Sequence, residues 1–147
     1  MTDKSEQARE RFLDAAYYAS KQSADPASRA LYEKGITEKV KSAYAAALSD
    51  YLVAPKVDSI NTIDYKGQVG NPIAIRAKDD FMVTRVKVEI LDASGTIIED
   101  GDAVTDDSAR NLWSYPAKAL NATPAGTTIR ATAFDKPGNT GSLEIVI

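Results

Sequence analysis

The stretch IRATAFDKPGNT, residues 129–140, decides the fold of this chain. Apolar residues at 129, 131 and 133 alternate with Arg130, Thr132 and Phe134. This period of two is typical of a strand with one buried face. Asp135 ends the run and can accept hydrogen bonds from the turn, where Gly138 and Asn139 tolerate positive φ. The stretch therefore predicts a strand and a tight hairpin that returns antiparallel through residues 140–147.

The same alternation recurs upstream, in runs separated by turn signals rich in Gly, Pro, Asn and Asp. Seven short strands within about 90 residues are typical of an immunoglobulin-like sandwich. The predicted strands cover residues 57–63, 72–78, 83–92, 96–100, 112–119, 127–135 and 140–147.

The N-terminal third has helical periodicity instead. Asp3 and Glu6 have the spacing of a capping pair, and Asp25-Pro26 is a signal for a new helix. We expect a first helix over residues 3–22, with an apolar stripe that recurs at helical spacing. The residues of this stripe are Ala8, Phe12, Leu13, Ala16, Tyr17 and Ala19.

Residues 26–52 allow two interpretations. In the first, Gly35 ends a helix that starts at Pro26, and Thr37 caps a third helix over residues 38–52. In the second, one long helix tolerates Gly35 at a cost of about 1 kcal/mol. In either case the buried face of the last segment is predicted to contain Val40, Tyr44, Ala47, Leu48 and Tyr51.

Ala54-Pro55 marks the boundary between the two patterns, because proline ends a helix and favours an extended conformation before it. We therefore expect an α+β chain with a helical region at residues 1–54 and an antiparallel immunoglobulin-like β-sandwich at residues 55–147. The helical region is predicted to be a helical hairpin or a three-helix unit.

Composition excludes several classes of function. The 147 residues include no His and no Cys, so the chain itself supplies no imidazole base, thiolate ligand or disulfide. The net charge is −3 and the basic residues are scattered, which argues against nucleic acid as a partner. No apolar run reaches the length of a membrane helix. If Met1 is native, its charged surroundings predict a cytoplasmic protein; a trimmed leader would leave an extracytoplasmic location open.

The C-terminal part resembles bacterial immunoglobulin-like domains. The resemblance is carried by the hairpin at residues 129–140, by the loop and strand opening at residues 77–86, and by the aromatic alternation Leu112-Trp113-Ser114-Tyr115. The whole chain is similar to bacterial two-part proteins that join a helical region to such a domain. This resemblance implies the fold and no particular activity, because sandwiches carry many functions.

The densest acidic cluster lies in residues 100–107. Its carboxylates, Asp100, Asp102, Asp106 and Asp107, are candidate Ca²⁺ ligands, since Ca²⁺ takes six to eight oxygens. The spacing is not that of an EF-hand, and we favour a solvated loop whose charges cap turns.

A second group of acids, Asp79, Asp80 and Asp135, is expected at one pole of the sandwich. It could hold a cation or provide a carboxylate pair for glycoside hydrolysis, but the favoured interpretation is that each acid holds its own turn. Trp113 is the only tryptophan and is expected in the core rather than as a sugar-stacking platform. The tyrosines of the helical region are expected to seal the helices.

These observations favour a non-catalytic interaction or spacer module that binds protein or carbohydrate. No catalytic residue and no cofactor are predicted. A glycan-acting hydrolase that uses paired carboxylates is one alternative, and a structural subunit that assembles through the helices is another. The sequence leaves the ligand and the oligomeric state open.

Overall fold

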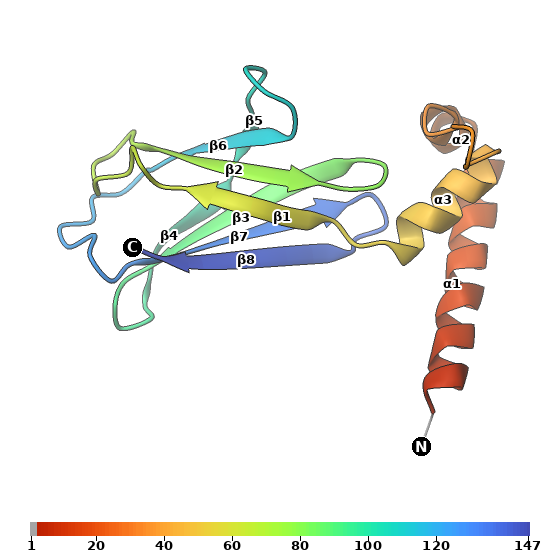
Figure 1. Cartoon of the computed structure of the whole chain (residues 1–147), viewed down its shortest axis with the longest axis horizontal. Helices are drawn as coiled ribbons and strands as arrows, with labels where there is room; N and C mark the ends of the chain where they lie inside the picture. Colours follow the sequence, from red (N-terminus) through yellow and green to blue (C-terminus); the bar gives the residue numbers. More distant parts are fainter. Residues whose placement is uncertain (1–2) are drawn as a thin grey trace. The chain divides into compact units, whose positions relative to one another are not determined.

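The structure is a computed structural model that describes residues 3–147, and it contains two compact units that divide between Ala54 and Pro55. The first unit holds three helices, α1 (Lys4–Ala24), α2 (Pro26–Glu33) and α3 (Ala43–Leu52) (Figure 1). The second unit is a sandwich of eight strands. The predicted α+β architecture is thus confirmed.

The helix starts follow the expected capping chemistry for α1 and α2. The side chain of Asp3 accepts a hydrogen bond from the Glu6 N–H at 2.8 Å, and Asp25 accepts one from the Ser28 N–H at 3.0 Å. Pro26 occupies the first turn of α2, where its missing N–H costs nothing. These side chains satisfy donors that the helix itself leaves unpaired.

Residues 26–52 form two helices, and the predicted start of the last one at residue 38 is wrong. The Oγ1 atom of Thr37 accepts hydrogen bonds from Lys39 and Val40, and the Thr37 N–H donates to the Val40 carbonyl. This closes a local turn instead of opening a helix. Helix α3 begins only at Ala43, with Ser42 as its cap.

The helices meet through small residues and one aromatic cluster. Tyr32 is fully buried and its hydroxyl donates to Asp50 at 2.6 Å, while Tyr18 packs edge-on against the Tyr32 ring. The buried alanines that allow this close packing are Ala15 and Ala19 of α1, and Ala43, Ala46 and Ala47 of α3.

The predicted apolar stripe on α1 is only partly correct. Ala19 is buried, but Phe12, Leu13 and Tyr17 are 51%, 58% and 66% exposed. The short second and third helices cover only the narrow side of α1 that carries Ala15 and Ala19, so the large side chains of the stripe face solvent.

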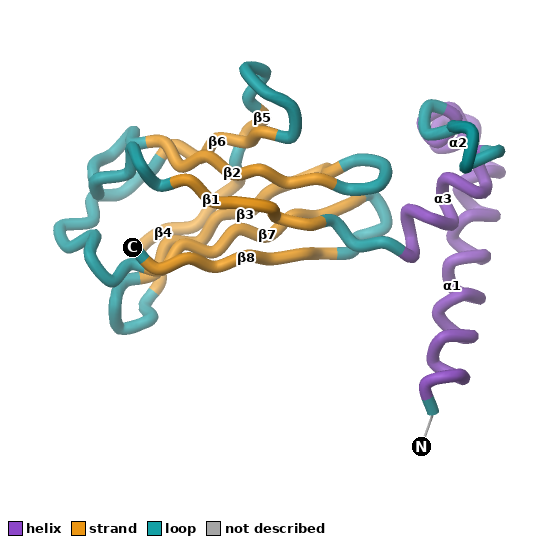
Figure 2. The backbone as a smooth tube through the Cα atoms, viewed as in Figure 1, coloured by secondary structure: helices purple, strands orange, loops and turns teal. Residues whose placement is uncertain are grey.

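The sandwich consists of two antiparallel four-stranded sheets, with strand orders β1-β2-β6-β5 and β4-β3-β7-β8 (Figures 1 and 2). This arrangement matches the immunoglobulin-like pattern of one four-stranded and one three-stranded sheet, with β4 added as a fourth strand to the sheet of β3, β7 and β8. The strands are β1 (Lys56–Asn61), β2 (Pro72–Lys78), β3 (Val83–Leu91), β4 (Ile97–Asp102), β5 (Val104–Thr105), β6 (Leu112–Pro116), β7 (Thr128–Asp135) and β8 (Thr140–Val146).

The core lies between the two sheets and follows the predicted alternation. Every second residue of β7 is buried, and β2 and β3 bury their aliphatic residues in the same way. Strand β1 departs from strict alternation, because a register shift between Val57 and Ser59 turns both Val57 and Ile60 toward the core. Strand β5 was not predicted, since two residues are too short to show a period.

In the described residues, 3–147, no helix has the length and apolarity needed to cross a membrane.

Candidate functional site

One pole of the sandwich brings together two of the three acids that the sequence placed there, Asp79 and Asp135. Asp79 follows β2 and Asp135 ends β7, and their carboxylate oxygens lie within 4.8 Å of each other. Asp135 accepts hydrogen bonds from the backbone of Gly138 at 3.0 Å and of Asn139 at 2.7 Å, and a third from the Asn139 side chain at 3.1 Å. Asp79 accepts one from the Met82 N–H at 3.3 Å. Each carboxylate therefore holds its own turn.

The surroundings of Asp135 alter its acidity. Burial raises the pKa of the Asp135 carboxyl above its ordinary value, and the nearby charge of Asp79 acts in the same direction, whereas the hydrogen bonds from Asn139 and Gly138 oppose the rise. Gly138 adopts the expected positive φ of 100°. Asn139, which also tolerates a positive φ, does not adopt one.

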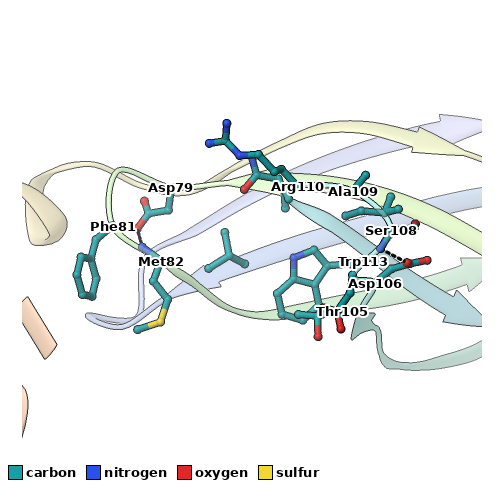
Figure 3. Close-up of a pocket in the computed structure, with 14 residues that line it drawn as sticks. Asp79, Phe81, Met82, Thr105, Asp106, Ser108, Ala109, Arg110 and Trp113 are labelled. Carbon is teal, nitrogen blue, oxygen red and sulfur yellow. Dashed lines mark hydrogen bonds between the residues drawn. The ribbon is translucent and has the colours of Figure 1, made fainter. Parts of the chain in front are cut away.

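A pocket of about 590 Å³ opens beside Asp79. One wall is the β2–β3 loop with Asp79, Phe81 and Met82, and the other is the β5–β6 loop, residues 106–111. Figure 3 shows the ring of Trp113 between the two walls. The lining thus combines aromatic and aliphatic side chains with acidic, basic and uncharged polar ones.

Hydrogen bonds hold the β5–β6 loop against β2. The Asp106 N–H donates to the Leu112 carbonyl at 2.9 Å and closes the loop. Asn111 has a φ of 59°, and its carbonyl accepts a hydrogen bond from the Ala77 N–H at 3.0 Å. Arg76 donates to the Arg110 carbonyl, also at 3.0 Å. The pocket wall is therefore anchored rather than free.

Trp113 was predicted to be a core residue, and the structure corrects this to a half-buried position. The ring packs against the edge of the core, and it also lines the pocket. The fully buried aromatic of β6 is Tyr115, on the same face of the strand. The indole N–H of Trp113 has no hydrogen-bond acceptor among residues 3–147. It is a donor available to a ligand.

The four candidate calcium ligands do not form one loop. Asp100 and Asp102 belong to β4, and Asp106 and Asp107 belong to the loop after β5. Asp102 is paired with Arg85 at 2.6 Å, and Asp106 accepts a hydrogen bond from the Ser108 N–H at 2.9 Å. Within the described chain, no three of the four carboxylates converge. The prediction of one acidic loop failed because strand pairing divides the segment.

Comparisons with known proteins concern the fold. No protein-family model matches the chain, and no curated protein matches it. Among solved structures it is similar to the tetra-tandem repeat in the extending region of a large adhesion protein, at 23% identity and a TM-score of 0.45. That match covers 63% of this chain and 23% of the other, so the chain spans about a quarter of that protein.

A second similar structure is CopC from Methylosinus trichosporium OB3b. It is 13% identical, with a TM-score of 0.42, and the match covers 63% of this chain and 91% of CopC. An engineered protein matches at 18% identity over 71% of this chain and 24% of its own, again with a TM-score of 0.42. Likenesses at this level say nothing of function.

Sequence reasoning missed part of the pocket. It singled out Asp79 and Trp113 separately, but it did not connect them, and it gave no role to Met82 or Arg110. The only local signal was the polar run Asp106-Asp107-Ser108-Ala109-Arg110-Asn111, which predicts a loop. Its convergence with the β2–β3 loop depends on the pairing of β2 with β6.

Proposed function

We propose that this protein is a non-catalytic interaction module that binds a protein or carbohydrate ligand at the pole of its sandwich. The observation that carries the proposal is the half-buried Trp113, with an unpaired indole N–H, in an anchored pocket of about 590 Å³. A tryptophan ring offers a large apolar face and one donor, a combination enriched in recognition sites.

We also propose that the chain has no hydrolytic activity of its own. The pair that a glycan hydrolase would use, Asp79 and Asp135, is engaged in turns. Asp135 is 3% exposed, which leaves little of its carboxylate accessible to a substrate. These facts support a structural role for the pair. Turnover on a glycan substrate that disappears in Asp79→Asn would contradict this proposal.

The binding proposal is tested with the labelled full chain on a glycan array and a peptide array. The comparison variants are Trp113→Phe, which keeps an aromatic ring but removes the N–H and part of the ring area, and Tyr44→Phe, which alters an exposed aromatic of α3 outside the pocket. We expect at least one ligand whose binding falls about tenfold in Trp113→Phe, equivalent to about 1.4 kcal/mol. Tyr44→Phe should leave that binding unchanged. Absence of any Trp113-dependent ligand on both arrays would overturn the proposal.

A second candidate function, a structural subunit that assembles through its helices, is favoured by one observation. Phe12, Leu13 and Tyr17 are exposed together on α1, and clustered apolar side chains on a surface mark association sites. This candidate predicts a molar mass in light scattering that rises with concentration and returns to that of a monomer in Leu13→Lys. A monomer at all concentrations would exclude it.

A further inference from the structure

We propose that the pocket beside Trp113 holds an ammonium group at the end of a lysine side chain of a protein partner. This inference rests on the proposed function and deepens it by naming the chemical class of the ligand.

The first argument is charge. The ionisable side chains that line the pocket are Asp79, Asp106, Asp107 and Arg110, three acids and one base. Asp107 makes no hydrogen bond within residues 3–147, so its carboxylate is available. Hydrogen bonds from Ser108 lower the pKa of Asp106 and keep it ionised. A wall of this composition attracts a cation and repels an anion.

The single base does not reverse this preference. Arg110 is exposed. Figure 3 shows its guanidinium at the outer edge of the residues that line the pocket, turned away from the ring of Trp113. Asp106 directly follows Thr105, the β5 residue that pairs with Trp113.

The second argument is the aromatic ring. A cation is attracted to the face of an aromatic ring, and tryptophan is the strongest of the three aromatic residues in this interaction. Trp113 lines the pocket together with the apolar side chains of Met82 and Val83, whereas Figure 3 shows the ring of Phe81 on the far side of Met82 from the indole. An aromatic ring in a pocket that is also lined by carboxylates and apolar side chains is suited to an ammonium group on a hydrocarbon stem.

The apolar wall selects lysine among such cations. Lysine carries a compact charge on four flexible carbons, and these can lie along Met82 and Val83 while the charge reaches the acids of the lining. An amino sugar places its ammonium directly on a polar ring and has no such stem. A basic peptide segment is therefore the occupant that the observations favour.

The experiment follows the fluorescence of Trp113, the only tryptophan, in the full chain. The probes are Nα-acetyl-lysine amide, its uncharged counterpart Nα-acetyl-norleucine amide, glucosamine and glucose. We expect saturable quenching by the lysine probe at millimolar concentrations, at least about threefold weaker binding of the norleucine probe, and loss of the lysine signal in high salt because the attraction is screened.

Two variants test the acids, and one serves as a control. Asp107→Asn and Asp106→Asn should each weaken binding of the lysine probe about two- to fivefold. Asp100→Asn removes an equal charge from β4, outside the pocket lining, and should leave binding unchanged. Asp107→Asn removes no hydrogen bond from the fold, so its result stands even if Asp106→Asn destabilises the loop.

The outcomes separate this inference from the proposed function. Equal binding of the norleucine and lysine probes would overturn it, and so would tighter binding of glucosamine than of the lysine probe. If either result is found together with a Trp113-dependent ligand on the arrays, the proposed binding function stands and only the lysine ligand is contradicted. If the lysine probe does not bind and the arrays show no Trp113-dependent ligand, both the proposed binding function and the proposed lysine ligand are contradicted.

Discussion

The hydroxyl of Tyr115 donates a hydrogen bond of 2.7 Å to the carboxylate of Glu99, and this bond joins the two sheets of the sandwich. Tyr115 belongs to β6 and Glu99 to β4, which lie in different sheets. The same carboxylate accepts the backbone N–H groups of Lys118 and Ala119, at 2.8 and 2.9 Å. One side chain thus connects a strand of each sheet with the segment that follows β6. Burial and the bond to Glu99 raise the pKa of the Tyr115 hydroxyl, which stays protonated as the donor.

Removing that donor should destabilise the sandwich. We expect Tyr115→Phe to lower the free energy of unfolding by about 1.5–3 kcal/mol, because the bond is made to a charged acceptor. The measurement is denaturant unfolding followed by Trp113 fluorescence. Tyr44→Phe, at an exposed position of α3, should change stability by less than about 0.5 kcal/mol. Equal effects of the two substitutions would show that the bond between the sheets contributes nothing.

Two glycines with nearly the same backbone conformation should differ in their tolerance of alanine. Gly67 and Gly95 have φ values of 85° and 88°, so alanine is strained at both. At Gly67 an added Cβ would lie 2.1 Å from the backbone carbonyl oxygen of Asn121, whereas at Gly95 no atom lies within 4 Å.

We therefore expect Gly95→Ala to cost about 1–2 kcal/mol from backbone strain alone. Gly67→Ala should cost more than about 3 kcal/mol, since the Asn121 segment must move and its hydrogen bond to the Gly67 carbonyl breaks. Urea unfolding of both variants provides the comparison. Equal losses of unfolding free energy in the two variants would show that residues 121–124 move to accommodate the added Cβ without destabilising the fold.

The pH dependence of stability should reveal the buried Asp135. Because its folded-state pKa is raised, its contribution to stability is present below the ordinary value of 3.8 and is lost as the pH rises through the folded pKa. Asn does not titrate. The stability of Asp135→Asn relative to the original chain should therefore rise as the pH increases above 3.8, and it should level off once the folded-state carboxyl is ionised.

Asp92 provides the opposite control. Hydrogen bonds from Ser94 and Thr96 lower its pKa below 3.8, so its contribution is present above that value and is lost as the pH falls through the folded pKa. Asp92→Asn should therefore differ from the original chain by a constant amount above about pH 5, and the difference should decrease as the pH falls below that value. If Asp135→Asn followed this second pattern, the burial argument for Asp135 would be wrong.

Calcium should have no selective effect on stability. Asp102 of β4 is paired with Arg85, and Asp106 lies in the loop after β5, so within residues 3–147 no three of the four candidate carboxylates converge on one Ca²⁺ ion. We expect about 10 mM Ca²⁺ and Mg²⁺, at equal ionic strength, to shift the melting midpoint alike and by less than about 1 °C. A shift of several degrees with Ca²⁺ alone, lost in the Asp102→Asn/Asp106→Asn double variant, would show a calcium site in this segment.

Local sequence patterns determined the secondary structure of this protein. Strand alternation in residues 129–135 and capping by Asp3 and Asp25 depend on neighbours at most four positions apart, so the sequence shows them directly. Local patterns failed where two local structures compete. Thr37 closes a turn instead of capping a helix, because its Oγ1 accepts N–H groups in both conformations.

Only the tertiary structure decided which apolar residues are covered and where a ligand site forms. Periodicity shows that α1 has an apolar side, but the positions of α2 and α3 decide that Ala15 and Ala19 are buried while Leu13 and Tyr17 are exposed. Trp113 and Asp79 share a pocket because β2 pairs with β6, which brings together two loops about thirty residues apart in the chain. Such pairing is set by the packing of the whole sandwich, and no short segment of sequence specifies it.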